Sequence, residues 1–421
     1  MNFHFPTDFY IGSATAAYQV EGNNINSDFW AEEHADGSPY KEKSGDAIDH
    51  FRLYKKDIAL MAKLGLKAYR FSIEWSRVEP ELGEFSQSAI EHYRDMLETC
   101  YEYDILPFVC LHHFSSPRWL IRMGGWANPE VTERFAKYCE TVFQKLGDLI
   151  PYVLTFNEVN LPVMLRDTFS QIGFIPPVGI DRESWTAPKW RESAARLCGT
   201  TAQKYFTFHM ISDDASLRTL QETHQKAREV IKRIHPETKV GLSMALSDIQ
   251  AVPGGEKRVE EVWHQYFRQY LPMIEGDDFF GLQNYTREVY GPDGRIKPAP
   301  DAELTQMGYE FYPEALGNVI RKVAEVIPIP IIVTEHGVAT DDDSRRIAFI
   351  QRGLAGVQKC LDDGIDVKGY LHWSTFDNYE WQSGYSMKFG LIAVNRKTQE
   401  RMIKESGRYL GEMAQLNAGK R

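Results

Sequence analysis

The sequence predicts an α/β protein in which one domain, residues 1–421, forms a closed (β/α)8 barrel with long loops after its strands. Three observations support this fold class. Short apolar runs alternate with longer stretches of helical period, and the alternation recurs eight times. Polar and aromatic residues follow the apolar runs, where barrel enzymes carry their chemistry. No linker rich in glycine and serine divides the chain.

The expected strands and helices follow one another along the whole chain. Strands are expected at residues 9–14, 68–73, 106–111, 152–156, 240–244, 279–282, 329–333 and 367–373. Helices are expected at residues 48–64, 86–103, 128–146, 191–235 with a break near 213, 259–270, 313–326, 344–361 and 402–416. Asn128 before Pro129 is typical of a helix start. A doubly wound open sheet is the alternative, but its glycine-rich phosphate-binding turn is missing.

One stretch between the expected elements is unusually long. Residues 159–189 contain four prolines and carry no clear helical or strand period. A loop of this length inside a compact domain is usually functional or disordered. We therefore expect it to be irregular and to be the loop whose shape the sequence predicts least.

Composition excludes several classes of function. Hydrophobic content of 43% and charged content of 25% are those of an ordinary soluble protein. A formal net charge of -11 argues against nucleic acid or an anionic membrane surface as the partner. Aromatic content of 13% is high and suits a cleft that stacks on small flat ligands. A small-molecule substrate is the expected partner, and self-association stays open.

The cysteines and the amino-terminal residues indicate a compartment. The five cysteines are scattered, odd in number and free of any CxxC pair, which is typical of a reducing environment. The first residues lack the basic and apolar regions of a secretory signal, and no run reaches the roughly 18 apolar residues of a membrane span. Neither HxH nor HExxH occurs, so we expect no metal and no cofactor. A cytoplasmic protein is expected.

Two acidic residues stand where a barrel would present them. Glu158 follows the fourth expected strand, and Glu335 follows three β-branched apolar residues of the seventh. Cleavage of a glycosidic bond needs two carboxyl groups, one protonated and one ionised. Arg70, at the end of the second strand, could keep one of them ionised by charge pairing. Acids at strand ends also serve many other reactions, so the pair alone does not decide the function.

Longer motifs make the prediction specific. The stretches FYIGSATAAYQVEG (9–22), YRFSIEWSR (69–77), LHHF (111–114), TFNE (155–158), TEHG (334–337) and WSTFDNYEW (373–381) occur in this order. Together they resemble the family 1 glycoside hydrolases, which are retaining β-glycosidases on a TIM barrel. The resemblance runs from residue 9 to about residue 394. It implies double displacement through a covalent glycosyl-enzyme, with carboxyl groups about 5–5.5 Å apart.

The resemblance also assigns roles to residues. It implies that Glu158 is the general acid/base and Glu335 the nucleophile, with Arg70 and Tyr285 keeping the nucleophile ionised. Because His112 and His113 are adjacent in a strand, only one ring can enter the site, and His113 is the one that the resemblance selects. The residues that it implies bind the sugar are Gln19, His113, Asn157, Gln283, Tyr285, Trp373, Glu380 and Trp381.

The chain departs from the family pattern at a few positions. His336 stands where the family usually has asparagine, and an imidazole that titrates near pH 6.5 could alter the pH profile in a supporting role. Val159 and Asn160 replace a proline and an aromatic residue after the acid/base, which weakens an aromatic platform for the leaving group. Gln283 replaces asparagine and extends the amide by one methylene.

The functional prediction is a retaining β-glycosidase, with β-glucosidase preferred, that acts on oligosaccharides or aryl and alkyl glycosides. The family branch for 6-phosphosugars places serine, lysine and tyrosine where this chain has Glu380, Met387 and Phe389, so a sugar without phosphate is expected. A β-galactosidase, a β-fucosidase or a transglycosidase is the alternative within the family. A sugar-binding barrel without catalysis is the alternative from another class, and a metal-dependent hydrolase finds no support.

Overall fold

The structure is a computed structural model that describes residues 3–170 and 188–418. Eight parallel strands close into a barrel in the order β1–β11–β10–β7–β5–β4–β3–β2, which confirms the predicted fold class. Strand β1 pairs with strand β11 and thereby closes the barrel, with Tyr10 in register with Gly369. The barrel strands are β1 Tyr10–Ala14, β2 Ala68–Ser72, β3 Leu106–Cys110, β4 Tyr152–Leu154, β5 Lys239–Ala245, β7 Phe279–Asn284, β10 Ile331–His336 and β11 Val367–Trp373.

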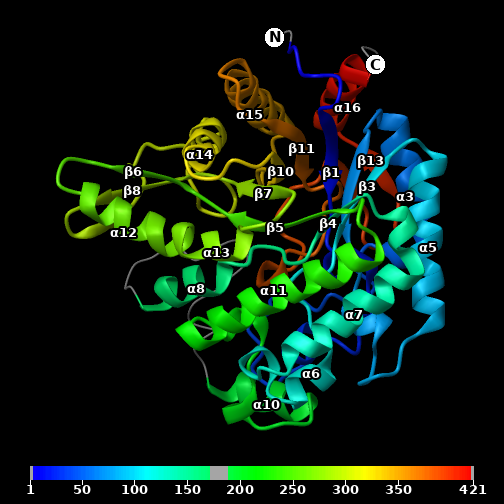
Figure 1. Cartoon of the computed structure of the whole chain (residues 1–421). Helices are drawn as coiled ribbons and strands as arrows, with labels where there is room; N and C mark the ends of the chain where they lie inside the picture. The colour runs from blue at the N-terminus through cyan, green and yellow to red at the C-terminus, as the bar shows by residue number, and fades with distance from the viewer. Residues whose placement is uncertain (1–2, 171–187, 419–421) are drawn as a thin grey trace.

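Helices surround the barrel on its outside (Figure 1). The long helices are α3 His50–Leu64, α5 Gln87–Glu102, α7 Val131–Leu146, α11 Asp214–Ile234, α12 Glu256–Tyr266, α14 Ala315–Ala324, α15 Asp343–Asp362 and α16 Glu405–Ala418. The shorter ones are α1 Ala17–Glu21, α2 Asp28–Glu33, α4 Trp75–Val78, α6 Arg118–Arg122, α8 Leu161–Ser170, α10 Pro188–Leu197 and α13 Leu271–Ile274. Asn417 on α16 donates to the Phe9 carbonyl at 2.8 Å, so the carboxyl-terminal helix packs beside the first strand.

Two small sheets lie outside the barrel, and the sequence did not predict them. β6 Asp248–Ala251, β8 Arg287–Gly291 and β9 Gly294–Ile296 form one sheet, and β12 Ile392–Val394 pairs with β13 Arg401–Ile403. β6 and β8 extend away from the barrel near α12 (Figure 1). Their strands are only three to five residues long, which leaves too little alternation to recognise in a sequence.

The interior of the barrel is filled by side chains that alternate with outward-facing ones along each strand. Ala68, Phe108, Leu154, Ile332 and Leu371 belong to one buried cluster, to which strands on all sides of the barrel contribute. The strands approach closely, because a Cβ added at Gly12 would lie 1.9 Å from the Ala68 carbonyl oxygen. The strand positions beyond this cluster face the mouth of the barrel, where the site lies.

Strand β10 contains an irregularity that decides which acid faces inward. The register with both neighbouring strands shifts between Val333 and the residues that follow it. Ile332 faces the interior, so strict alternation would turn Thr334 inward and Glu335 outward. The extra residue of a β-bulge resets the alternation. Glu335 therefore faces the interior, and His336 faces the surrounding helices.

Three of the expected elements need correction. The stretch at 159–189 begins with a helix, α8, whose Pro162 lies in the first turn, where a missing N–H costs no hydrogen bond; residues 171–187 lie outside the described part of the chain. The helical stretch expected at 191–235 does break near residue 213, but the break is longer than expected, because α10 ends at Leu197 and α11 begins at Asp214. The helix expected from residue 402 begins at Glu405, because β13 precedes it.

In the described ranges, no helix combines the length and the apolar content that crossing a membrane would need. All five cysteine thiols are free and buried.

Candidate active site

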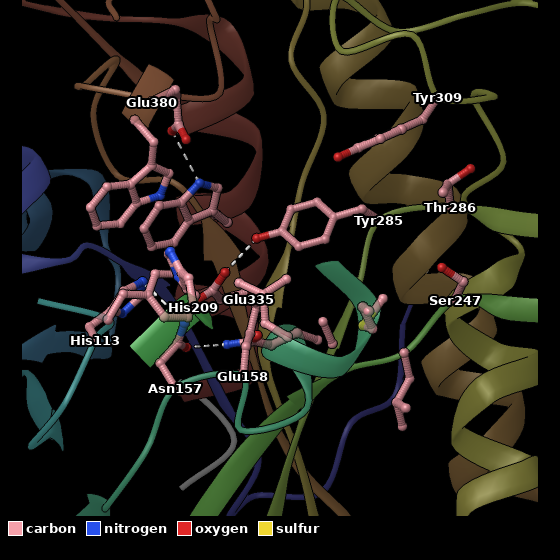
Figure 2. A pocket seen from close by; sticks show the side chains of 18 of the residues that line it. His113, Asn157, Glu158, His209, Ser247, Tyr285, Thr286, Tyr309, Glu335 and Glu380 are labelled. Atoms are coloured by element: carbon pink, nitrogen blue, oxygen red, sulfur yellow. Dashed lines mark hydrogen bonds between the residues drawn. The ribbon is translucent and has the colours of Figure 1, made fainter. Parts of the chain in front are cut away.

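A deep pocket opens where the barrel strands end at their carboxyl termini. It encloses roughly 1140 Å³ of empty space, the solvent at its mouth included. All ten residues predicted as catalytic or sugar-binding line it, although they come from distant parts of the chain. They are Gln19, His113, Asn157, Glu158, Gln283, Tyr285, Glu335, Trp373, Glu380 and Trp381. Figure 2 shows Glu158 and Glu335 near the centre of the lining side chains.

Glu335 has two strong hydrogen-bond donors. Arg70 forms a buried ion pair with Oε1 of Glu335, and the Tyr285 hydroxyl donates to Oε2 at 2.5 Å. Burial raises the pKa of Glu335, while the positive charge of Arg70 and the hydrogen bond from Tyr285 lower it. Each donor stabilises the charged carboxylate, so the two together favour an ionised Glu335.

Glu158 has a different environment. It follows β4 with a positive φ of 45°, and its backbone N–H donates to the Ser243 hydroxyl at 3.3 Å. No residue of the described chain donates a hydrogen bond to its carboxyl group. Burial, followed by the negative charge of Glu335, raises the pKa of Glu158 well above its usual range, against an opposing effect of Arg70. Glu158 therefore keeps a proton more firmly than Glu335 does.

A polar network joins the two sides of the pocket floor. The carbonyl oxygen of Asn157 accepts from Arg70 at 2.5 Å and from the Gln283 amide at 2.7 Å. The Asn157 amide nitrogen lies 3.2 Å from Nε2 of His113. The additional methylene of Gln283 brings its amide within reach of Asn157, and its own carbonyl oxygen is buried without a partner among the described residues. That oxygen can accept from a hydroxyl group of a ligand.

The far end of the pocket is built by the amino-terminal and carboxyl-terminal parts of the barrel. The Gln19 amide donates to the Tyr379 carbonyl at 2.7 Å and lies 3.3 Å from a Glu380 oxygen. The Trp373 indole donates to Glu380 at 3.3 Å, and its ring stacks near His113 with centroids 5.7 Å apart. Amide, carboxyl and imidazole groups beside an indole face match a sugar, which has hydroxyl groups on its rim and C–H groups on its face.

His336, a position where an imidazole could alter the pH profile, lies outside the pocket. Its Nδ1 lies 2.8 Å from the Tyr370 hydroxyl, and its ring stacks on Phe349 of α15. Burial lowers the pKa of His336 well below its usual range, which favours the neutral ring. His112 is also outside the pocket, where it lies 3.0 Å from Ser116 in the core.

The motifs left part of the pocket unpredicted. The additional lining residues come from the β5–β6 and β7–β8 connections, β8, β9 and the segment before α14, and they include Ser247, Thr286, Glu288, Arg295 and Tyr309. They lie in segments that match no motif and have little periodicity, so no sequence signal marks them. Asn160 stands where the family has an aromatic residue. It is buried, and its amide donates hydrogen bonds to the Ala245 and Tyr266 carbonyls instead of lining the pocket.

No three potential metal-ligating side chains gather anywhere in the described residues. At the centre of the pocket, two carboxyl groups with unequal hydrogen-bond partners lie close to the Arg70 cation, and carboxyl, amide, imidazole and indole side chains surround them. On the carboxyl-terminal face of a (β/α)8 barrel, this arrangement defines an enzyme that cleaves glycosidic bonds.

Comparison with known proteins places the chain within that class. Residues 1–418 match the family model of glycosyl hydrolase family 1, and the chain belongs to this family. β-Glucosidase A of Thermotoga maritima is 30% identical, and the alignment covers 98% of each chain. The solved structure of a β-glycosidase named BGL167 is 47% identical, with a TM-score of 0.92 over 98% of each chain. A β-glucosidase from Thermotoga maritima in complex with deoxynojirimycin is 27% identical, with a TM-score of 0.82 over 99% of each chain.

Proposed function

We propose that the protein is a retaining β-glucosidase that hydrolyses β-glycosides without phosphate, and that it does so by double displacement. The observation that carries the proposal is the unequal environment of the two carboxyl groups. Glu335 accepts from Arg70 and Tyr285, whereas no described residue donates to the carboxyl group of Glu158. Double displacement needs one ionised nucleophile and one protonated acid on the two sides of the scissile bond.

In the first step, a carboxylate oxygen of Glu335 attacks the anomeric carbon and forms a glycosyl ester. The bond to the leaving oxygen breaks with its electron pair, and Glu158 transfers its proton to that oxygen. As the negative charge of Glu335 is lost in the ester, the repulsion that keeps Glu158 protonated weakens. Glu158 thus becomes a base when the second step needs one.

In the second step, Glu158 takes a proton from water while the water oxygen attacks the anomeric carbon from the face that the leaving group has vacated. The ester bond breaks, Glu335 regains its charge, and two inversions give overall retention. A second sugar that replaces water would give transglycosylation by the same residues. The ratio of these two outcomes depends on what occupies the pocket beyond Glu158.

The preference for glucose rests on relatives and on the far end of the pocket. Curated relatives named as β-glucosidases, such as β-glucosidase A of Acetivibrio thermocellus at 30% identity, align over 98% of this chain. Gln19 and Glu380 can bind either epimer of a 4-hydroxyl group, so β-galactosides and β-fucosides are the alternative substrates within this proposal. The buried carboxyl group of Glu380 offers a phosphate group no positive charge, which supports a substrate without one.

Azide rescue tests the two roles separately. In Glu335→Ala, hydrolysis of an aryl β-glucoside should fall by about 10⁴-fold or more, and azide should restore turnover with an α-glucosyl azide as the product. In Glu158→Ala, azide should instead give the β-glucosyl azide, because it attacks the intermediate on Glu335. Glu237→Ala, which removes an exposed carboxyl group, is the control and should show wild-type turnover without azide stimulation.

Undiminished activity of Glu335→Ala, or a β-azide from that variant, would exclude Glu335 as the nucleophile. Tight binding of glucosides by the wild-type protein without turnover would support the sugar-binding barrel instead.

A further inference from the structure

A second pocket, separate from the catalytic one, lies where the loop between α1 and α2, residues 22–27, meets the first turn of α5. Figure 1 shows α5 on the outside of the barrel. The pocket encloses roughly 790 Å³ of empty space, its open mouth included. None of its described lining residues also lines the catalytic pocket. We call it the outer pocket, and the residues that line it include Asn24, Ile25, Arg77, Pro80, Ser86 and Ser88.

The side chain of Asn24 gives the clearest indication that the outer pocket binds a ligand. Asn24 is only 3% exposed, and both polar atoms of its amide, Oδ1 and Nδ2, are buried without a hydrogen-bond partner among the described residues. Buried polar groups are usually hydrogen-bonded, because a buried group without a partner loses its interactions with water and gains nothing in return. Since Oδ1 accepts and Nδ2 donates, a ligand that both donates and accepts would satisfy the two atoms together.

The first turn of α5 adds further polar groups to the same pocket. The Ser86 hydroxyl accepts from the Ala89 N–H at 3.2 Å and lies 3.1 Å from the Ser88 hydroxyl. Helix α5 is 16 residues long, and the N–H groups of its first turn have no acceptors within the helix. Donors and acceptors of three kinds, an amide, two hydroxyl groups and backbone N–H groups, are therefore available to one ligand.

The charges around the outer pocket favour a neutral ligand. Arg77 is the only charged residue among its described lining residues, and its Nε donates to Oε2 of Glu21 at 2.6 Å. Nη2 of Arg77 donates to the Gly22 carbonyl, and the guanidinium lies 4.2 Å from the centroid of the Phe51 ring. Glu21 thus balances the charge of Arg77. A carboxylate or a sulfate could accept from Nδ2 of Asn24 but could not donate to its Oδ1, whereas a hydroxyl group can do both.

Apolar side chains complete the outer pocket. Ile25 is 52% exposed, Pro80 is partly exposed, and both line the pocket. A sugar ring has C–H groups on its faces, which can pack on such side chains, and hydroxyl groups on its rim, which can meet the amide and the serines. A wholly apolar ligand would leave the buried amide of Asn24 without partners.

We propose that the outer pocket is an accessory binding site for a neutral sugar, in which Asn24 exchanges two hydrogen bonds with neighbouring hydroxyl groups of the ring. Ser86, Ser88 and the first turn of α5 bind further hydroxyl groups, and Ile25 and Pro80 contact the C–H groups. No carboxyl group is among the described lining residues, so the sugar is bound without being cleaved. The proposal does not depend on the proposed glycosidase activity, because no catalytic residue takes part in it.

The test measures glucose binding to the full chain by saturation-transfer NMR in a Glu380→Ala background, which weakens sugar binding in the catalytic pocket. Asn24→Leu keeps the size of the side chain and removes both polar atoms, and Ser88→Trp fills the mouth of the outer pocket from an exposed position. Glu380→Ala alone should still bind glucose, and each added substitution should weaken that binding by about ten-fold or more.

Asn24→Leu should not lower the apparent Tm, because it removes a buried amide without partners. With Glu380 intact, this variant should also keep the wild-type kcat/KM for 4-nitrophenyl β-glucoside. Ser88→Trp decides the question even if Asn24→Leu fails to fold.

Asn318→Leu is the matched control, because Asn318 is an exposed residue of α14 that donates to Asp248 at 2.8 Å and lines neither pocket. It should leave glucose binding in the Glu380→Ala background unchanged. The proposal is overturned if that background shows no saturable glucose binding, or if neither Asn24→Leu nor Ser88→Trp weakens it. Displacement of the bound glucose by sulfate would also contradict it, because that result indicates a site for anions.

Discussion

At the scale of single residues, the chemistry depends on which carboxyl group receives hydrogen bonds. Glu158 and Glu335 are both buried, and burial raises the pKa of each. Arg70 and Tyr285 stabilise the negative charge of Glu335 alone through direct contacts. The resemblance to the family predicted both acids and both partners. The sequence could not show the unequal environments, because they depend on contacts between residues as far apart as Arg70 and Glu335.

Tyr285→Phe removes one hydroxyl group and so tests whether its hydrogen bond keeps Glu335 ionised. The hydrogen bond from Tyr285 favours the ionised form of Glu335, so its removal should raise the pKa of that carboxyl group. Glu335 must be ionised to attack, and activity is therefore lost as the pH falls through its pKa. The acid limb of the kcat/KM profile should move to higher pH, by about 0.5–1 unit, and the maximum should fall.

Tyr370→Phe is the control for this prediction. It also removes a buried tyrosine hydroxyl, but one that contacts His336 on the outside of the barrel. The pH profile of that variant should match the wild type even if its thermal stability is lower. An acid limb that stays in place in Tyr285→Phe would show that this hydroxyl does not set the ionisation of Glu335.

At the scale of elements, the sequence predicted strand β10 but not the bulge within it. Three β-branched apolar residues before an acid predicted the strand and its position in the chain. Simple alternation from Ile332 would have turned Glu335 outward, and only the register shift after Val333 brings it into the pocket. A bulge of one residue leaves no mark in hydrophobic periodicity. The same register shift explains why the His336 ring contacts α15.

The contact between β10 and α15 gives a prediction about stability. A Cβ added at Gly353 of α15 would lie 2.4 Å from Cε1 of His336, so Gly353→Ala should lower the apparent Tm although alanine is the better helix former. Asparagine at position 336 is shorter than histidine and leaves room for the methyl group. In the His336→Asn background, the loss caused by Gly353→Ala should therefore shrink or reverse, with a coupling of about 1–2 kcal/mol in the double-mutant cycle.

Thermal or urea unfolding of the four proteins measures this coupling. Because His336 lies outside the pocket and burial lowers its pKa, His336→Asn should also leave the pH profile of hydrolysis unchanged. Additive effects of the two substitutions on stability would contradict the close packing of the ring on Gly353.

At the scale of the whole molecule, barrel closure assembles one pocket from both ends of the chain. Gln19 on α1 contacts Glu380 near the carboxyl-terminal end, and Arg70 contacts Glu335 across the barrel. Alternation of strands and helices was enough to predict this closure, since each barrel strand contains a short apolar run. The pocket residues outside the motifs and the strands β6, β8 and β9 were not predicted, because these short insertions show neither the helical nor the strand period. Charge complementarity between Glu288 and Arg295 becomes visible only when the β8–β9 hairpin brings them together.

The central claim is that Glu335 forms a covalent bond to the sugar while Glu158 handles the proton. The most direct measurement uses a 2-deoxy-2-fluoro-β-glucoside with a very good leaving group, in which the fluorine slows both steps and the leaving group needs no acid. We expect intact-mass spectrometry to show one fluoroglucosyl group for each chain, and peptide mapping to place it on Glu335. Glu335→Gln should stay unlabelled, and Glu158→Gln should still be labelled. A label on another residue, or labelling of Glu335→Gln, would contradict the mechanism.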